Sequence, residues 1–549
     1  MSDNIISGLV ASSEDAEQVQ TSLLRSILSA NADTEYGKKY SFSDISSIDG
    51  YQERVPLSDW ETYKEPVSRM MKGEEGILTS EAPVYYCISS GMSDVPRYTP
   101  LTTEDILIQK KYWIDGIEES VASYFSSMSS KYSKGRIFYI GEFFRTFTEN
   151  GVMSGVRIGA PYRLLEDSGE LDLECFTSPK EVLFSEKLED LLYIKVLFAL
   201  KDRSVTSIQG IFVHKIVGLF DHLRKNWDHY VNDIATGTVS SHFKLSDEMR
   251  AYLEKNLKPD IARANELKRI LPGDGKGLAL KIWPGLQYVC TAGGSCFSGY
   301  MEALKKYIGL TPVHYFVYAT SESSIGISLD MNGKDAYYTL IPEAAVFEFM
   351  PVDDPQKRPV MAWETERDKE YELYVTTRSG LYRYSVGDIV RVTDHCGKMP
   401  VVTFSYRKSQ VIDLADENMT SRQIENAVTS LGEAMGTTIK EYCIDTEPFE
   451  GDGAKPYYTV YIETGMGRSI NDAKCSELVD GFFGKENTGY GKAREAARLS
   501  GARVITLEKG SFRSYGASLS EKGYRMEHIR PLRIIINEAQ RAFFRDHIK

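Results

Sequence analysis

The sequence changes character at residues 404–410, FSYRKSQ, and this break constrains the fold more than any other feature of the chain. Before it runs a long alternation of strand-like and helix-like segments, and after it an independent α+β pattern begins. At 549 residues the chain is too long for one core of ordinary size. We therefore expect an α/β protein with a large N-terminal domain, residues 1–406, and a smaller C-terminal domain, residues 407–549.

Periodicity predicts the main elements on both sides of this break. After Pro100, Thr102 or Thr103 can cap a helix whose apolar positions recur on one face. Residues 372–392 are typical of a hairpin. Further strands are expected at 136–140, 288–291, 313–318, 457–463 and 503–507, and helices at 212–233, at 421–431 and around Met301, Leu304 and Ile308.

Composition excludes several classes of partner. The apolar fraction of 42% and charged fraction of 26% are those of a globular protein, and the formal net charge is -13 without a long basic run. Nucleic acid is therefore not expected as a partner, since its binding needs concentrated positive charge. The longest apolar run, residues 191–200, is about half the ~20 residues that span a bilayer. We expect no membrane insertion, no secretory signal and a cytoplasmic location.

The seven cysteines are scattered and form no CxxC pair, so the sequence supports neither a disulfide framework nor a zinc site. The segment GDGKG at 273–277 lacks the strand and helix that would flank a nucleotide fingerprint, and is expected to be a connection.

Three separated loops could converge on a nucleotide. The first lies within YYCISSGMSDVPRYTPLT, residues 85–102. Phosphate oxygens are bound by small residues with hydroxyl and backbone donors, together with a cation. The donors here are Ser89, Ser90, Gly91 and Ser93, and the cation is Arg97. A Ser-Ser-Gly turn after a strand is also common as plain structure.

The second loop lies within VYATSESSIGI, residues 317–327. Tyr318 offers a flat face for a base, Thr320 and Ser321 offer hydroxyls, and Glu322 offers a carboxylate at a strand end. A carboxylate next to phosphates suits a Mg²⁺ ion held by both. Glu322 could equally be a helix cap or a solvated loop acid.

The third loop is Gly387-Asp388, after the sequence YRY. A fixed aspartate can accept the two hydrogen bonds that the hydroxyls of a ribose donate. Alone, a Gly-Asp pair between strands decides nothing, because it is a common turn.

The order of these loops, followed by an arginine before a small domain, resembles the adenylate-forming superfamily. More specifically, the chain is similar to the acyl-acid amido synthetases of the plant auxin-responsive (Gretchen Hagen) family. The resemblance spans nearly the whole chain and includes TEYGKKYSFSDI, VPLSDWETYKEPVSRMMKGE, NWDHYVNDIATGTV and LKIWPGLQYVCTAGGSCFSGYMEAL.

This resemblance implies a large adenylate-forming domain with a smaller, mobile C-terminal domain, acting as an ATP- and Mg²⁺-dependent ligase. A carboxylic acid would be activated as an acyl adenylate with release of pyrophosphate. An amine, typically that of an amino acid, would then accept the acyl group to form an amide. Positioning and charge stabilisation would supply most of the catalysis, and no covalent nucleophile is required. A monomer or weak oligomer is expected.

The resemblance also implies residue roles. The β- and γ-phosphates would be cradled by Ser89, Ser90, Gly91, Ser93 and Arg97, and Mg²⁺ would be held by Glu322. The adenosine and the reacting groups would contact Tyr318, the backbone at Gly293 and Gly294, Thr320, Ser321 and Asp388. Arg407 would be the hinge of the mobile domain. The catalytic charges would be those of Glu322, Arg97 and, in the C-terminal domain, Arg530.

Several positions depart from the family pattern. Family members usually carry Thr at Met92, Gly at Asp94, Lys at Arg97, Arg at Ser385, and Gly-Glu-Lys at residues 416–418. Near the C-terminus, GYRMEHIRPLR lacks the lysine expected to reach the phosphate, so Arg525, His528 or Arg530 replaces it or nothing does. These departures leave one alternative, a catalytically impaired member that serves as a ligand-binding or regulatory protein. A second alternative, a ligase that forms a thioester with coenzyme A, would use the same first half-reaction.

Overall fold

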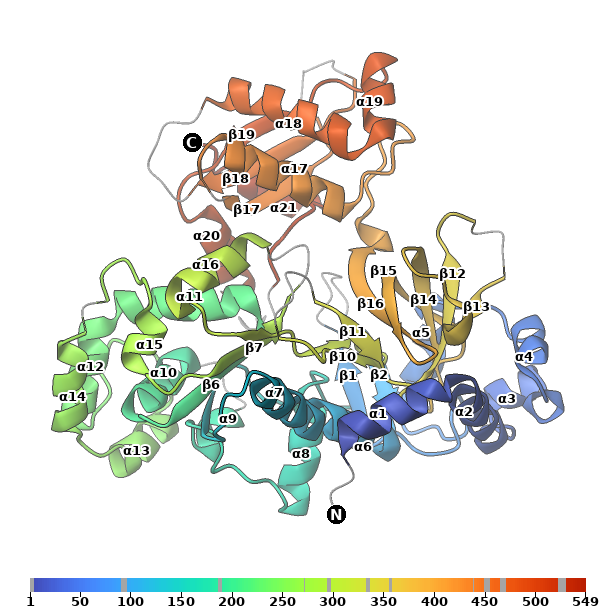
Figure 1. The fold of residues 1–549 in the computed structure, drawn as a ribbon, viewed down its shortest axis with the longest axis horizontal. Helices are drawn as coiled ribbons and strands as arrows, with labels where there is room; N and C mark the ends of the chain where they lie inside the picture. Colours follow the sequence, from blue (N-terminus) through green and yellow to red (C-terminus); the bar gives the residue numbers. More distant parts are fainter. Residues whose placement is uncertain are drawn as a thin grey trace. The chain divides into compact units, whose positions relative to one another are not determined.

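The computed structural model describes residues 4–89, 96–185, 190–270, 272–293, 298–331, 336–354, 358–437, 439–448, 455–464, 471–521 and 530–549. They form two compact units, which Figure 1 shows as a ribbon coloured along the chain. The larger comprises Met1–Gly294 and Glu302–Phe404, and the smaller Ser295–Met301 and Ser405–Lys549. The division after Phe404 falls inside strand β16 (Met399–Arg407), where the sequence changes character.

Among the described residues, the larger unit contains three sheets. The first has the strand order β2-β1-β5-β4, the second is parallel with the order β3-β6-β7-β8, and the third has the order β13-β12-β14-β15-β16-β11-β10-β9. Their strands are β1 (Tyr85–Ile88), β2 (Tyr98–Leu101), β3 (Arg136–Tyr139), β4 (Thr146–Phe147), β5 (Met153–Gly155), β6 (Val205–Phe212), β7 (Tyr288–Ala292), β8 (Val313–His314), β9 (Val317–Ala319), β10 (Ser324–Ile327), β11 (Tyr338–Leu340), β12 (Val346–Pro351), β13 (Val360–Met361), β14 (Glu370–Thr376), β15 (Tyr384–Cys396) and β16.

Helices surround these sheets in the order α1 (Ile5–Glu14), α2 (Ala16–Ala30), α3 (Glu35–Lys39), α4 (Ile48–Arg54), α5 (Trp60–Met71), α6 (Thr103–Lys110), α7 (Gly116–Ser127), α8 (Gly159–Ser168), α9 (Lys180–Leu183), α10 (Leu191–Lys201), α11 (Val213–Lys225), α12 (Trp227–Thr236), α13 (Asp247–Asn256), α14 (Ile261–Lys268), α15 (Leu278–Ile282) and α16 (Ser298–Ile308). In the described part of the chain, no helix has the length and apolar character that crossing a membrane requires.

The helix predicted after Pro100 forms as α6. Thr102 caps it, and the side chain of Asp105 reaches back to the Thr102 backbone, which completes a capping box. Ile106, Trp113 and Ile117 are all buried, as their spacing predicted. A π-helical segment at Lys111–Asp115 separates α6 from α7, an interruption that the periodicity did not reveal.

The smaller unit has helices on both faces of one sheet, whose strand order is β17-β18-β19 (Figure 1). Buried side chains of α17 and α18 pack on one face, and those of α20 and α21 on the other. Its elements are β17 (Ile439–Asp445), β18 (Thr459–Thr464), β19 (Arg503–Thr506), α17 (Ser421–Ala434), α18 (Asp472–Glu486), α19 (Thr488–Glu495), α20 (Ser511–Glu521) and α21 (Glu538–Arg545).

One predicted strand is wrong in form. Residues 313–318 were expected to form a single strand, but they form β8 in the parallel sheet and β9 in the eight-stranded sheet. The chain changes sheet at Phe316, whose φ of 47° lies in the left-handed region that non-glycine residues seldom adopt. Periodicity cannot reveal such a change of sheet, because Val313, Tyr315 and Val317 alternate as in an ordinary strand.

Candidate functional site

Part of the predicted site lies among the described residues. In the larger unit these are Ser89, Arg97, Gly293, Tyr318, Thr320, Ser321, Glu322 and Asp388, and in the smaller unit Arg407 and Arg530. Outside the described residues lie Ser90, Gly91, Ser93 and Gly294, together with Met92, Asp94, Arg525 and His528.

Ser89 and Arg97 close the base of the first predicted loop. The Ser89 N–H donates to the Arg97 carbonyl over 2.9 Å, and the Arg97 N–H donates to Ser89 Oγ over 3.3 Å. They continue the antiparallel pairing of β1 and β2, in which Ile88 lies opposite Tyr98. The Arg97 guanidinium lies 6.0 Å from the ring centroid of Trp60, within range of a cation–π contact. The loop therefore connects two hydrogen-bonded strands, and Arg97, the cation predicted for it, lies at the C-terminal end of the loop.

Thr320 shapes the second predicted loop. Its Oγ1 accepts the N–H groups of Glu322 and Ser323 at 3.3 and 3.4 Å, and its own N–H donates to the Ser323 carbonyl at 3.0 Å. This is the local side-chain-to-backbone turn that short hydroxyl residues favour. The hydroxyl hydrogen of Thr320 is not used in these bonds, so it remains compatible with donation to a ligand.

Glu322 is buried at this turn, and its carboxylate faces the hydroxyl of Tyr384. Tyr384 Oη donates to Glu322 Oε1 over 3.3 Å. Burial and then the nearby Glu322 carboxylate raise the pKa of Tyr384, against a smaller lowering effect of Arg97. Tyr384 is thus a neutral hydrogen-bond donor at ordinary pH. Sequence reasoning gave it no role, although it is the second tyrosine of the YRY motif.

Arg157 is a second cation of this region that sequence reasoning missed, and unlike the exposed Arg97 it is buried. It follows β5, its side chain is 8% exposed, and its Nη1 donates to the Ser321 carbonyl over 2.9 Å. Burial lowers the pKa of Arg157, while Cys87, Asp105 and Glu322 oppose that effect. Its Nε has no hydrogen-bond partner within the described structure. The only sequence signal was a single charge inside the apolar stretch SGVRIGAP.

Cys87 lies in the same interior, at the end of β1. Burial raises the pKa of its thiol to about 12 although Arg157 lowers it. The thiol is protonated at neutral pH and a poor nucleophile, because the thiolate is the reactive form.

Tyr318 and Asp388 come together in the eight-stranded sheet. Tyr318 Oη donates to Asp388 Oδ2 over 2.9 Å, and both side chains are buried. Asp388 follows Gly387, whose φ of 76° suits glycine, within β15. The register of β14 and β15 shifts at this point, a bulge that turns a side chain out of the regular alternation.

Position 293 requires glycine because a neighbouring aromatic ring leaves no room for a side chain. A Cβ at this position would lie 2.2 Å from Cδ1 of Tyr315, far inside van der Waals contact. The glycine therefore allows the ring to cover the backbone after β7. Whether adenine also contacts this backbone remains a prediction.

Two departures from the family pattern fit their local structure. Ser385 Oγ donates to Glu372 Oε1 over 2.7 Å and accepts the Gly387 N–H over 3.1 Å. In the smaller unit, Asp416 and Asn418 adopt φ values of 63° and 48°, which Asp and Asn tolerate better than most residues. These substitutions preserve the loops in which they lie.

Arg407 and Arg530 both belong to the smaller unit. Arg407 is the last residue of β16, directly before a short 3₁₀ helix at Lys408–Gln410. Arg530 is exposed at the beginning of the last described segment. Their roles as hinge and phosphate contact remain predictions.

Comparison with known proteins identifies the family. Residues 5–313, 338–407 and 422–539 match the GH3 family N-terminal, central and C-terminal domains. Indole-3-acetic acid-amido synthetase GH3.3 of Arabidopsis thaliana is 28% identical over 92% of this chain and 88% of its own length. Probable indole-3-acetic acid-amido synthetase GH3.12 of Oryza sativa subsp. japonica is 25% identical over 95% and 92%.

A solved structure has the same fold. The GH3.15 acyl acid amido synthetase superposes with a TM-score of 0.85 at 21% identity, covering 99% of this chain and 96% of its own. The resemblance inferred from the sequence and the predicted α/β fold are both confirmed. The chain belongs to the GH3 family.

Proposed function

We propose that the protein is an acyl-acid amido synthetase that uses ATP. In the first step, a carboxylate oxygen of the acid attacks the α-phosphorus, and the bond to the leaving pyrophosphate breaks. In the second, an amine nitrogen attacks the acyl carbon, the bond to AMP breaks, and the nitrogen loses a proton. The observation that carries this proposal is the match of all three consecutive family domains to one chain.

Glu322 is the residue that we propose for Mg²⁺. Among the described residues, no group of three or more His, Cys, Asp and Glu side chains is arranged to hold a metal. Magnesium does not require one, because it commonly takes one or two carboxylates, substrate phosphates and water. The buried Glu322 carboxylate, with the Tyr384 hydroxyl on Oε1, fits that requirement. The ion would neutralise phosphate charge as it develops.

Tyr318 and Asp388 are the residues that we propose for the adenosine. Asp388 accepts from Tyr318 at Oδ2, and a carboxylate has further lone pairs for the ribose hydroxyls. The Tyr318 ring, which lies 5.6 Å from the ring of Tyr338, offers an aromatic surface for the base. The bond between them would fix the sugar relative to the base.

Two arginines would stabilise negative charge during the first step. Arg97, with Ser89 beside it, is proposed for the β- and γ-phosphates, and its guanidinium can replace the usual lysine there. Arg157 supports the turn with Thr320 and Ser321, which we propose contacts the α-phosphate or the acyl carboxylate. Preorganised positive charge of this kind is a major source of catalysis in such transfers.

The smaller unit would complete the second step. We propose Arg407 as the hinge residue and Arg530 as the cation that replaces the missing lysine. Motion of a domain around a ligand is a common way to exclude water and exchange catalytic groups. The same proposal includes an amino acid as the amine, a cytoplasmic location and a monomer or weak oligomer.

The test is pyrophosphate release by the purified protein with Mg-ATP across a panel of carboxylic acids, each with and without a mixture of amino acids. Release that depends on one acid, with formation of its amide, would support the proposal. Transfer to coenzyme A would instead indicate a thioester-forming ligase. No release with any acid, together with no ATP binding by calorimetry, would contradict the proposal and favour an impaired, ligand-binding member.

A further inference from the structure

Arg383 has an unusual backbone conformation next to the candidate site. Its φ is 48°, and the residue is only 3% exposed. A non-glycine residue in the left-handed region is strained and persists only where its surroundings hold it. Such outliers concentrate at functional sites, and the next residue, Tyr384, donates to Glu322.

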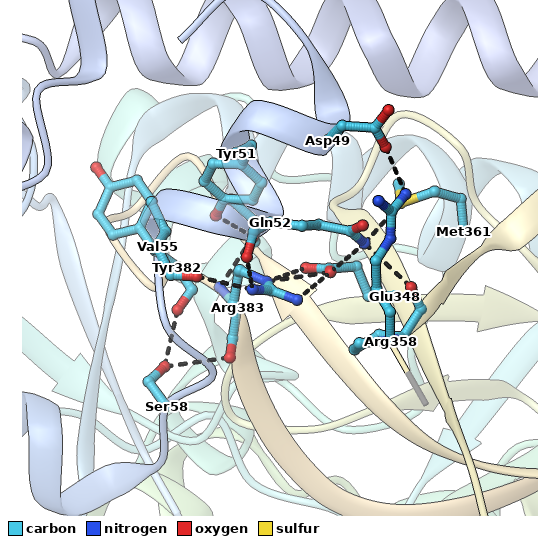
Figure 2. Close-up of polar contacts among 12 residues, drawn as sticks. Asp49, Tyr51, Gln52, Val55, Ser58, Glu348, Arg358, Met361, Tyr382 and Arg383 are labelled. Carbon is cyan, nitrogen blue, oxygen red and sulfur yellow. Dashed lines mark hydrogen bonds and ion pairs between the residues drawn. The ribbon is translucent and has the colours of Figure 1, made fainter. Parts of the chain in front are cut away.

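The Arg383 side chain is held from several directions, as Figure 2 shows. Its Nε lies 3.1 and 3.0 Å from the two carboxylate oxygens of Glu348, and its Nη2 lies 2.9 Å from Oε1. Its Nη1 donates to the carbonyls of Gln52 and Val55, both at 2.7 Å. Arg383 therefore joins β12 to the end of α4 and the residue that follows it.

The backbone on each side of Tyr384 is held by Ser58. The Ser58 N–H donates to the Arg383 carbonyl over 3.0 Å, and the Ser385 N–H donates to the Ser58 carbonyl over 2.8 Å. Ser58 Oγ also donates to the Tyr382 carbonyl over 2.7 Å (Figure 2). The backbone of Tyr384 is thus fixed on both sides, and its hydroxyl, at the far end of the ring, donates to Glu322.

Burial of the Arg383–Glu348 ion pair carries a cost in desolvation free energy. Both side chains are almost completely buried, at 4% and 2% exposure. Taking two charges out of water offsets much of their attraction, and such pairs can often be replaced by apolar residues without loss of stability. What an apolar pair cannot supply is the planar, directional set of bonds that fixes the turn.

We propose that Arg383, held by Glu348 and the α4 carbonyls, is a positioning residue that aims the Tyr384 hydroxyl at the Glu322 carboxylate. The inference rests on the proposed function, since Glu322 is the residue proposed for Mg²⁺. The Arg383 guanidinium is taken up by Glu348 and the Gln52 and Val55 carbonyls, so the role assigned to it is positioning and not substrate contact. The N-terminal segment around α4 thereby supports the site, although none of its residues lies in the three predicted loops.

Arg383→Lys and Tyr384→Phe test this inference. Lysine keeps the charge but not the guanidinium fork, and phenylalanine keeps the ring but not the hydroxyl. The matched control is Arg263→Lys, because Arg263 is equally buried and donates to two backbone carbonyls, of Leu200 and Ile282, and to Glu266. Each protein is assayed below its melting temperature for Mg-ATP affinity by calorimetry and for the Mg²⁺ concentration that half-activates pyrophosphate release.

Arg383→Lys and Tyr384→Phe are expected to weaken Mg-ATP binding and raise the half-activating Mg²⁺ concentration by about 5-fold each, as for one lost hydrogen bond. The double variant should show no greater loss of Mg-ATP affinity than the more impaired of the two single variants, because both substitutions act on one contact. Arg263→Lys should lower only the melting temperature. If Arg383→Lys resembles Arg263→Lys, the inference is overturned while the proposed function stands. A parent protein that binds no Mg-ATP would overturn both.

Discussion

The hydroxyl of Tyr318 donates to one carboxylate oxygen of Asp388 over 2.9 Å, inside a sheet where both side chains are buried. The two residues come from different predicted loops, and they are 70 positions apart in the chain. Their bond makes the proposed base and ribose contacts a single unit, so a change to either residue should affect ATP binding.

Tyr318→Phe should raise the KM for ATP, because it removes the donor that orients Asp388. A hydrogen bond to a charged group is worth about 1.5–3 kcal/mol, so we expect an increase of at least about 10-fold. Asp388→Ala should lower kcat/KM for ATP by about 100-fold or more, since the ribose loses its acceptor. Steady-state pyrophosphate release at varied ATP measures both. Parent-like kinetics for Asp388→Ala would contradict the ribose assignment.

Glu322→Gln should abolish most activity while leaving the fold intact. Glutamine keeps the size of the side chain and can accept from Tyr384, but it removes the charge that would bind Mg²⁺. We expect turnover to fall by about 100-fold, as for the loss of several kcal/mol of metal-assisted stabilisation. Glu343→Gln is the control, because Glu343 is half-buried but pairs with Lys111. Recovery of Glu322→Gln turnover by excess Mg²⁺ would support the assignment, and parent-like turnover at ordinary Mg²⁺ would refute it.

Arg157→Lys should reduce kcat/KM by about 10-fold with the fold retained, because lysine keeps the charge without the guanidinium geometry. The Ser321 carbonyl would lose its donor, and the turn that carries Glu322 would be less fixed. Arg163→Lys is a suitable control, since Arg163 is buried but bonds to Glu166 and the Phe184 carbonyl. Equal kinetic effects of the two substitutions would argue for a general loss of packing.

Asp94→Gly should preserve or raise ATP turnover. It removes a negative charge from a loop expected to bind phosphate and restores the residue that the family usually carries. Asp94→Asn separates the two effects, because it removes the charge but keeps a Cβ. A marked loss of turnover in Asp94→Gly would mean that this carboxylate takes part in binding.

Stability should depend on pH through His314. Burial lowers the pKa of His314 to about 4, and its neutral ring is held by the Ser328 carbonyl and the Phe316 N–H. In the unfolded chain the pKa is about 6.5, so the unfolded state binds more protons between these values. Stability should therefore fall as the pH decreases from about 6.5 to about 4, by roughly 3 kcal/mol in total.

The measurement is the free energy of unfolding at several pH values, for the parent and for His314→Gln. The substitution should flatten the decrease between about pH 6.5 and 4, while His242→Gln, at an exposed position, should not. An unchanged pH profile in His314→Gln would place the acid sensitivity in other groups.

The sequence was a good guide where the pattern was local and repeated. The cap at Thr102, the hairpin of β14 and β15 and the alternation of the smaller unit follow from side-chain spacing, which depends on residues close in the chain. Glu322, Tyr318 and Asp388, which the family motifs assigned to one site, all lie in the larger unit, and their roles stay predictions.

The sequence could not predict contacts that depend on distant packing. Arg157 and Arg383 are single charges in apolar surroundings, and nothing local indicates that the first reaches Ser321 or the second reaches Glu348. Gly293 suggested a ligand, whereas the ring of Tyr315 is sufficient reason for a glycine there. The change of sheet at Phe316 depends on which sheet offers a free edge, which is a property of the whole unit.

The change of sheet at Phe316 also limits how the chain can change in length. His314 is paired in register with Cys290 in one sheet, and Val317 with Ile327 in the next, so only two residues connect two fixed registers. An insertion or deletion of one residue here would turn Tyr318 to the opposite face of its sheet. Relatives that retain the Tyr318 contact should therefore differ in length elsewhere, and not between β8 and β9.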